Sequence, residues 1–325
     1  MTRILILGGG GMVGQKLVRR LLDHGLPGRD DVQITLHDIA FPPDGAPIDD
    51  RRQGDLSYPA EGAALAAERF DIIYFLASIV SGEAETNFDK GWTTNLAAMW
   101  HFLEELRAQH AATKGACRPR LIFTSSIAVF GGPYPDKIDD EFLQSPQTSY
   151  GAQKAACELL IQDYSRKGFV DGISLRLPTI CVRPGKPNLA ASSFFSGIIR
   201  EPLNGQRAVL PVNDTVRHWH ASPRSAARFL THAATIREEQ LQGRRALNLP
   251  GLSCTVAEQI EALRSVAGQE AVDRIDHKPD PDIIKIVSGW PRDFAPDRAR
   301  ALGFEAEKTF AEIIQTYIDD DLPRA

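Results

Sequence analysis

The stretch RILILGGGGMVGQKLVRRLLDHG, residues 3–25, decides the fold. It begins as an aliphatic run typical of a buried strand and continues with the apolar spacing of a helix that ends at a glycine. Between the two, Gly8, Gly11 and Gly14 follow the spacing G-x-x-G-x-x-G, and Gly10 adds a G-x-G. Such a loop lets the backbone approach a pyrophosphate, whose charge the following helix N-terminus stabilises. The stretch therefore predicts the first strand, turn and helix of a dinucleotide-binding fold.

Strands and helices alternate through the first half of the chain. This alternation predicts an α/β fold of the Rossmann type, a doubly wound parallel sheet covered by helices on both faces. In such sheets ligands bind beyond the carboxyl ends of the strands. The expected strands are 3–8, 32–38, 70–77, 120–126 and 172–178, and the clearest helices are 14–25, 92–112 and the segment that begins at Ser149.

The alternation breaks after Pro178, where the segment TICVRPGKPNLAASSF is rich in proline, glycine and asparagine. Residues 222–236 read as a helix that begins with a serine cap followed by proline. We expect a dinucleotide-binding domain at 1–178 with a contribution from about 216–246. Residues 179–215 and 247–325 are expected to form a smaller mixed α/β portion that binds substrate.

Composition narrows the class of protein. The chain has 325 residues, 43% of them hydrophobic and 24% charged, which is typical of a globular protein. Its net charge of −5 argues against a nucleic-acid partner, and no apolar run approaches the roughly 20 residues that cross a membrane. The N-terminus reads as a strand rather than a signal peptide. The four cysteines, with no C-x-x-C pair, favour reduced thiols in the cytoplasm and no metal site; they are Cys117, Cys157, Cys181 and Cys254, and we expect Cys157 to be a buried structural thiol.

Asp38, at the end of the second expected strand, indicates which dinucleotide binds. A carboxylate there accepts hydrogen bonds from the adenosine ribose hydroxyls and repels a 2′-phosphate. No arginine follows it directly, so the sequence favours NAD over NADP as cofactor. Asp55 could bind the adenine edge or be an exposed turn aspartate, and His37 is expected to be a packing residue.

Tyr150 and Lys154 stand four residues apart and therefore on one face of the expected helix. Alone, such a pair occurs often by chance, but together with a nicotinamide cofactor it indicates a catalytic pair. Oxidation of an alcohol requires a base for the hydroxyl proton, and the tyrosine pKa of about 10 is high for that task. A neighbouring ammonium is expected to lower it. Thr124, Ser125 and Ser126, at the end of an expected strand, supply hydroxyls that can orient a substrate.

Together these motifs resemble the extended short-chain dehydrogenase/reductase superfamily. The resemblance rests on the glycine loop, Asp38, TSSIAVFG from Thr124, Tyr150-x-x-x-Lys154 and VRHWHASPR from Val216, and it extends over essentially the whole chain. It implies that Tyr150 is the base, that Lys154 clamps the ribose and lowers the Tyr150 pKa, and that Ser126 positions the hydroxyl beside Ser125.

The resemblance also implies further cofactor contacts and a homodimer. The dimer would form through the helix at 92–112 and the Tyr150 helix. Asn95 matches a helix asparagine of the superfamily, although a plain helix-surface amide is the alternative. The implied cofactor residues are Gly8, Gly11, Met12, Val13, Gly14, Asp38, Asp55, Leu56, Leu76, Ala77, Ser78, Asn95, Tyr150, Lys154 and Thr179.

The substrate region departs from nucleotide-sugar relatives. Thr179 in RLPT stands where epimerases of that type usually carry asparagine, and TSSIA lacks the acidic pair of the dehydratases. Residues 183–205 and 210–224 instead resemble the D-erythronate dehydrogenase branch, which oxidises the C2 hydroxyl of a four-carbon sugar acid to a 2-keto acid with NAD.

A sugar acid requires a cation for its carboxylate and polar groups for its hydroxyls, and guanidinium binds carboxylate as a bidentate fork. The alternatives are a surface position for Arg183 and a structural hydrogen bond for His218, while Arg217 stands at the position that contacts phosphate in nucleotide-sugar relatives. The candidate substrate residues are Ser125, Ser126, Arg183, Asn188, Ser192, Arg217 and His218.

Two other functions stay open at this point. A nucleotide-sugar 4-epimerase would use the same tyrosine with a transiently reduced cofactor. A non-catalytic dinucleotide sensor is the second alternative, but such proteins commonly lose one of the groups found here as Ser126, Tyr150 and Lys154.

Overall fold

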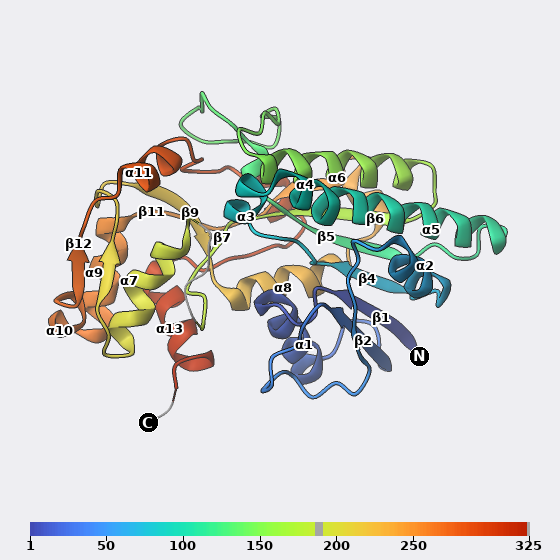
Figure 1. The fold of residues 1–325 in the computed structure, drawn as a ribbon, viewed down its shortest axis with the longest axis horizontal. Helices are drawn as coiled ribbons and strands as arrows, with labels where there is room; N and C mark the ends of the chain where they lie inside the picture. Colours follow the sequence, from blue (N-terminus) through green and yellow to red (C-terminus); the bar gives the residue numbers. More distant parts are fainter. Residues whose placement is uncertain (186–190, 324–325) are drawn as a thin grey trace.

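A seven-stranded parallel sheet forms the centre of the computed structural model, which describes residues 1–185 and 191–323 (Figure 1). The strand order β10-β6-β5-β4-β1-β2-β3 confirms the Rossmann-type prediction. The five strands predicted from the sequence are all present, and β3 and β10 are additional. The strands are β1 (Thr2–Leu7), β2 (Val32–Asp38), β3 (Arg51–Gln53), β4 (Ile72–Phe75), β5 (Arg120–Ser126), β6 (Asp171–Leu177) and β10 (Ala246–Asn248).

Alternate residues of β1 serve the two faces of the sheet. Ile4 and Ile6 pack toward one helical layer, and Leu5 and Leu7 toward the other. Helices α1 (Met12–His24) and α8 (Pro223–Ala233) cover the first face, whereas α2 (Pro59–Ala67), α5 (Ala98–Ala112) and α6 (Ser149–Arg166) cover the second (Figure 1). Burial on both faces explains why these strands read as continuous apolar runs.

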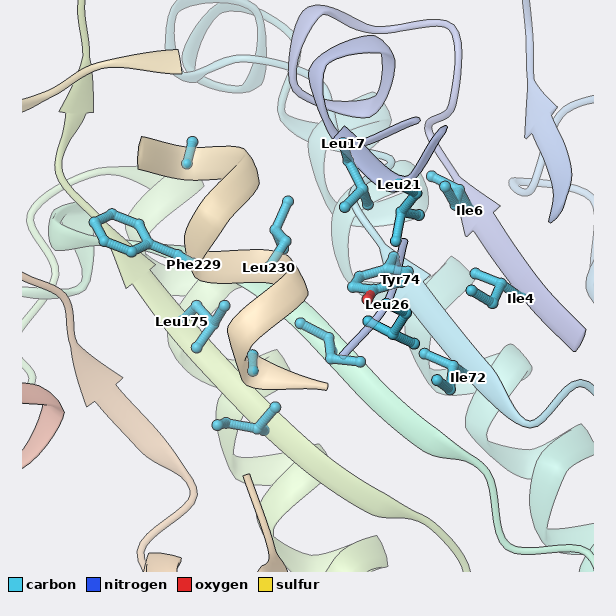
Figure 2. Packing of buried hydrophobic residues seen from close by; sticks show 14 of the residues in the cluster. Ile4, Ile6, Leu17, Leu21, Leu26, Ile72, Tyr74, Leu175, Phe229 and Leu230 are labelled. Atoms are coloured by element: carbon cyan, nitrogen blue, oxygen red, sulfur yellow. The ribbon is translucent and has the colours of Figure 1, made fainter. Parts of the chain in front are cut away.

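The core on the α1 face joins segments that lie far apart in the sequence. Leu17 and Leu21 of α1 pack near Ile6, and Leu230 of α8 lies in the same cluster (Figure 2). Truncating such a fully buried leucine to alanine costs roughly 2–5 kcal/mol. Helix α8 therefore completes the helical layer that begins with α1. The division of the chain into two portions, with its expected residue limits, stays a prediction.

The C-terminal portion is built around two small sheets. The first has the order β11-β9-β7 and the second pairs β12 with β8. Strand β7 follows β6 after a single proline, so the central sheet leads directly into this portion. Phe195, Ile198, Leu263 and Ile313 form its core. The elements are β7 (Thr179–Ile180), α7 (Ser193–Leu203), β8 (Ala208–Leu210), β9 (Arg217–Ala221), β11 (Leu252–Thr255), α9 (Val256–Ala267), α10 (Gln269–Val272), β12 (Ile275–His277), α11 (Pro281–Ser288), α12 (Asp297–Ala301) and α13 (Phe310–Asp320).

The expected helix at 92–112 has two parts. It begins as a π-helical segment, η1 (Trp92–Ala97), and continues as α5. Such wide turns are often found at functional sites. Short helices α3 (Ser81–Thr86) and α4 (Phe88–Gly91) precede it. In the part of the chain that the structure describes, no helix has the length and apolar content that crossing a bilayer requires.

Candidate active site

Three glycines of the first turn are required by close backbone approach. Gly8 has a φ of +86°, and a Cβ there would lie 2.6 Å from the backbone nitrogen of Ala77. A Cβ on Gly10 would lie 1.9 Å from the carbonyl oxygen of Ala40, and one on Gly14 would lie 2.4 Å from that of Gly8. A side chain at any of these three positions would therefore push apart the backbone segments that meet between β1 and α1.

Gly11 faces open space instead. A Cβ there would meet only the Gly8 carbonyl oxygen, at 3.5 Å, and the residue lines a cavity of about 420 Å³. Gly11 is also the N-cap of α1 and brings no side-chain cap, so the first N–H groups of the helix are available to an anion. Met12 and Val13 line the same cavity. The turn therefore fits a dinucleotide pyrophosphate.

Asp38 holds this loop in place. Its Oδ2 accepts a hydrogen bond from the Gly10 N–H at 2.9 Å, and its Oδ1 accepts one from the Ile39 N–H at 2.7 Å. Its ribose contact stays a prediction. Asp38 is not among the residues that line the cavity, and neither are the other two expected near the adenosine. Asp55 accepts from the Ser57 N–H at 2.8 Å within its own turn, and Leu56 packs in the core. His37 is buried against Glu61, as expected of a packing residue.

The loop after β4 forms the next part of the wall. Leu76 and Ser78 line the cavity, while Ala77 packs behind Gly8. Asn95 lies beneath the loop with only 3% of its surface exposed, so the helix-surface alternative is wrong. Its Oδ1 accepts from the Ser78 hydroxyl and from the Ile79 N–H, both at 2.9 Å. Asn95 thus positions the loop and does not itself line the cavity.

Tyr150, Lys154 and Ser126 line one cavity, as their motifs predicted. Helix α6 begins where the Thr148 hydroxyl accepts from the Gly151 N–H at 3.1 Å. A Cβ on Gly151 would lie 2.1 Å from the Ala128 carbonyl oxygen, so only glycine lets the helix start this close to the Ser126 segment. The Ser126 oxygen accepts from the Ala128 N–H at 3.1 Å, which leaves its own proton to donate into the cavity.

The ammonium of Lys154 is buried. It donates to the Thr124 carbonyl oxygen at 2.8 Å and lies 4.6 Å from the centre of the Phe123 ring and 5.5 Å from that of Tyr150. Burial lowers the pKa of Lys154 to about 8. The ammonium has three N–H donors, so donors remain for a cofactor.

The electrostatics of Tyr150 differ from the sequence-based expectation. Burial raises the pKa of Tyr150 to about 12, and the charge that opposes this rise is the Arg183 guanidinium. That Lys154 lowers the Tyr150 pKa stays a prediction; its ammonium lies 5.5 Å from the centre of the Tyr150 ring.

Ser125 is at the cavity wall, but its hydroxyl is directed elsewhere. It donates to Oε1 of Glu158, which is held by Arg176 at 2.8 Å. Its only proton is committed to Glu158, so the Ser125 oxygen can only accept from other groups, and its substrate contact stays a prediction. Cys157, two helical turns from Tyr150, is fully buried, and burial raises its thiol pKa to about 12, which confirms the structural role.

Arg183 and Ser192 form the opposite wall. The Arg183 guanidinium donates to the Ser192 hydroxyl at 2.8 Å and to the Ile180 carbonyl at 2.9 Å. It lines the cavity near Tyr150, so the alternative of a plain surface arginine is wrong. Within residues 1–185 and 191–323, no carboxylate forms an ion pair with it. Its charge is available to an anionic ligand.

His218 and Thr179 complete this wall. The His218 Nε2 lies 2.7 Å from the Thr179 hydroxyl oxygen, and Nδ1 lies 2.9 Å from the Pro291 carbonyl oxygen. Burial lowers the pKa of His218 to about 4, so the ring is neutral near pH 7. The histidine thus makes structural hydrogen bonds and lines the cavity as well.

Two predicted substrate residues are not part of the described cavity. The prediction for Arg217 is wrong: its guanidinium pairs with Glu258 at 3.2 Å and donates to the Ser253 carbonyl, also at 3.2 Å. Arg217 precedes His218 on β9, and neighbours on a strand point to opposite faces. Asn188 lies outside the described residues.

Sequence reasoning missed Trp290 and Pro291, which follow α11 and line the cavity. The Trp290 ring lies 5.1 Å from that of His218, at 39°. A lone tryptophan in an aperiodic segment carries no pattern that would have placed it here.

Comparison with known proteins gives one family and several full-length relatives. The family described as "NAD dependent epimerase/dehydratase family" matches residues 4–240. A D-erythronate dehydrogenase of Cupriavidus necator is 45% identical over 98% of both chains. One of Haemophilus influenzae is 43% identical over 98% of this chain and 100% of its own. The crystal structure of a nucleoside-diphosphate-sugar epimerase from Agrobacterium tumefaciens is similar with a TM-score of 0.94 and 53% identity, over 99% of this chain and 94% of that one.

Proposed function

The chain belongs to the NAD-dependent epimerase/dehydratase family, within the extended short-chain dehydrogenases/reductases, and on this premise we propose that it oxidises D-erythronate to 2-keto-D-erythronate. NAD is its cofactor, in agreement with the prediction from the glycine loop and Asp38. Both the Cupriavidus and the Haemophilus relative carry the name of this activity.

The observation that carries the proposal is the Arg183 guanidinium. It lines the same cavity as Tyr150 and has no carboxylate partner in the described chain. A buried cation of this kind favours a ligand that brings its own negative charge. The hydroxyls of Ser126, Ser192 and Thr179 line the cavity as well. The combination suits a small polyhydroxy acid.

In the proposed reaction the substrate carboxylate binds the Arg183 guanidinium, and Ser126 and Tyr150 hydrogen-bond the C2 oxygen. Bound NAD supplies the acceptor for the hydride that leaves C2. The phenol oxygen of Tyr150 takes the hydroxyl proton as the C2–O bond becomes a carbonyl, so the products are a 2-keto acid, NADH and a proton. The Arg183 charge favours the phenolate that this step requires. Lys154, anchored on the Thr124 carbonyl, holds the ribose with its remaining donors.

The name of the Agrobacterium structure gives weight to the alternative, a nucleotide-sugar 4-epimerase. That function needs a cation for the diphosphate, and Arg217 stands at the position that would supply it. The Arg217 guanidinium is instead paired with Glu258, outside the cavity. Thr179 in place of asparagine also favours the sugar acid.

The experiment is to measure NADH formation at 340 nm with NAD and a panel of D-erythronate, L-threonate and UDP-glucose, together with sugar analysis of the UDP-glucose reaction. We expect NADH from D-erythronate and no epimerised nucleotide sugar. Epimerisation of the UDP-sugar without NADH from any acid would replace the proposal with the epimerase. NAD binding with no turnover of either class would favour the sensor.

We further propose that the enzyme is a homodimer that works in the cytoplasm. Helices α5 and α6 lie side by side (Figure 1), and they expose Trp100 at 48% and Leu159 at 66%. A pair of such helices from each subunit would cover these side chains. Light scattering should give a dimer, and Leu159→Lys should weaken it while Leu143→Lys, in an exposed loop, should not. A monomeric wild type would contradict the dimer, and activity outside the cytosolic fraction of cells would contradict the location.

A further inference from the structure

The proton positions around His218 follow from its neighbours. The Pro291 carbonyl oxygen, 2.9 Å from Nδ1, can only accept a hydrogen bond, so Nδ1 must carry a proton. The ring is neutral, because burial lowers its pKa to about 4, so Nε2 carries none. Nε2 therefore accepts the hydroxyl proton of Thr179 across 2.7 Å.

The ring is fixed in this orientation by packing on both sides. His218 stacks on Phe195 with a centroid distance of 5.3 Å and an interplanar angle of 5°, and Trp290 lies 5.1 Å away. The side chain is 3% exposed, so it neither flips nor exchanges its partners for water without disturbing the core. The direction of the hydrogen bond from Thr179 is thereby set by the fold.

The consequence lies at Thr179. Its only proton is committed to Nε2, so the oxygen can only accept from other groups. Thr179 lines the cavity together with Arg183 and Tyr150. A ligand that lies against it gains a hydrogen bond only if it brings a donor.

We propose that the Thr179–His218 pair selects substrates that carry a second hydroxyl besides the one that is oxidised. The proposal rests on the function proposed above and names the feature of the sugar acid that the enzyme reads. Arg183 binds the carboxylate, Tyr150 and Ser126 bind the oxidised hydroxyl, and Thr179 accepts from a hydroxyl further along the chain. His218 is a positioning residue that acts through Thr179.

The first test pairs enzyme variants with substrate analogues. Thr179→Val keeps the branched shape of the side chain but removes the hydroxyl oxygen that accepts the hydrogen bond. Thr179→Ser keeps that hydroxyl. We expect Thr179→Val to lower kcat/KM for D-erythronate by about 10- to 100-fold, with Thr179→Ser close to wild type. One of the two analogues, 3-deoxy- or 4-deoxy-erythronate, should be a poor substrate for the wild type and lose nothing further in Thr179→Val. An equal loss by Thr179→Val on D-erythronate and on both analogues would overturn the proposal.

The second test addresses His218 without any substrate. Imidazole ¹⁵N shifts of the NAD-bound enzyme at pH 7 should show His218 protonated at Nδ1 and bare at Nε2. The Nε2–H form would overturn the proposal whatever the enzyme oxidises. Absence of activity on D-erythronate would, in contrast, reject the proposed function and with it the hydroxyl-selection step.

A matched variant separates positioning from folding. We expect His218→Phe to weaken the discrimination between D-erythronate and the poor deoxy analogue, because the freed Thr179 hydroxyl can then donate. His232, on α8, is a partly buried histidine whose Nε2 lies 2.8 Å from the Leu302 carbonyl oxygen and which does not line the cavity. His232→Phe should change thermal stability but leave the discrimination ratio unchanged. If both variants alter the ratio alike, His218 has no special role and the proposal fails.

Discussion

The two walls of the cavity are built in different ways. The cofactor wall consists of backbone, where Gly8, Gly10 and Gly14 close against neighbouring chain with no room for a Cβ. The substrate wall consists of side chains, Arg183, Thr179 and others, brought together from separate segments of the C-terminal half. The first wall is set by the fold and suits the pyrophosphate that dinucleotides share. The second is set by individual side chains and decides the substrate.

Tyr150, where the two walls meet, should give the largest effect. Tyr150→Phe removes the proton acceptor and should lower kcat by about 10²- to 10⁴-fold, with NAD affinity close to wild type by fluorescence titration. Tyr164→Phe is the matched control, because that tyrosine lies on the same helix and its hydroxyl donates to Glu104. A Tyr150→Phe enzyme of near-normal rate would contradict its role as the base.

The two arginines predicted from the sequence test the substrate wall. Arg183→Gln removes the free cation and should raise KM for D-erythronate about 10- to 100-fold, the usual loss of a charged hydrogen bond. It should also move the acidic limb of kcat/KM, where Tyr150 becomes protonated, to higher pH, since Arg183 opposes the rise in the Tyr150 pKa. Arg217→Gln should leave both unchanged, because its partner is Glu258. A raised KM in Arg217→Gln, with Arg183→Gln close to wild type, would show that Arg217 binds the substrate carboxylate.

Two glycines test the cofactor wall. A Cβ on Gly14 meets the Gly8 carbonyl oxygen and the Gly9 backbone, so Gly14→Ala should destabilise the fold by roughly 1–3 kcal/mol. Gly11→Ala meets no obstacle in the protein and adds its methyl to the space for the pyrophosphate. It should weaken NAD binding while thermal unfolding stays near wild type. Equal destabilisation by the two variants would show that Gly11 is structural.

A smaller effect concerns stability at acidic pH. The pKa of His218 is about 4 in the folded chain against 6.5 when unfolded, and that of buried His220 is also well below 6.5. Below pH 6.5 the unfolded chain therefore binds protons that the folded chain does not, so stability is full above pH 6.5 and falls as the pH drops. His218 alone should lower the free energy of unfolding by about 2 kcal/mol when the pH falls from 7 to 5. In urea unfolding between pH 7 and 5, His218→Gln should show a shallower loss than wild type, and an identical slope would contradict the shift.

The cofactor wall could be predicted from the sequence because its signals are local. The strand, glycine turn and helix are contiguous, and strands 32–38 and 120–126 have the predicted bounds. Strands β3 and β10 were missed because three residues are too short to show a period.

The substrate wall could be predicted only in part. Arg217 and His218 are neighbours on β9, and the alternation of a strand allows only one of them to reach the cavity. The sequence did not say which. The electrostatics of Tyr150 were missed because they depend on its burial and on the charge of Arg183, a residue far away in the sequence. Trp290 enters from a segment without periodicity.

The central claim is that the sugar acid loses the hydrogen on C2 while Tyr150 takes the proton. The most direct measurement is mass spectrometry of the NADH formed from D-erythronate that carries deuterium at C2 only. We predict that the NADH contains the deuterium, that the product is the 2-keto acid without it, and that Tyr150→Phe abolishes both at the same time. Unlabelled NADH, with the deuterium retained in the product, would place the oxidation at another carbon and contradict the account.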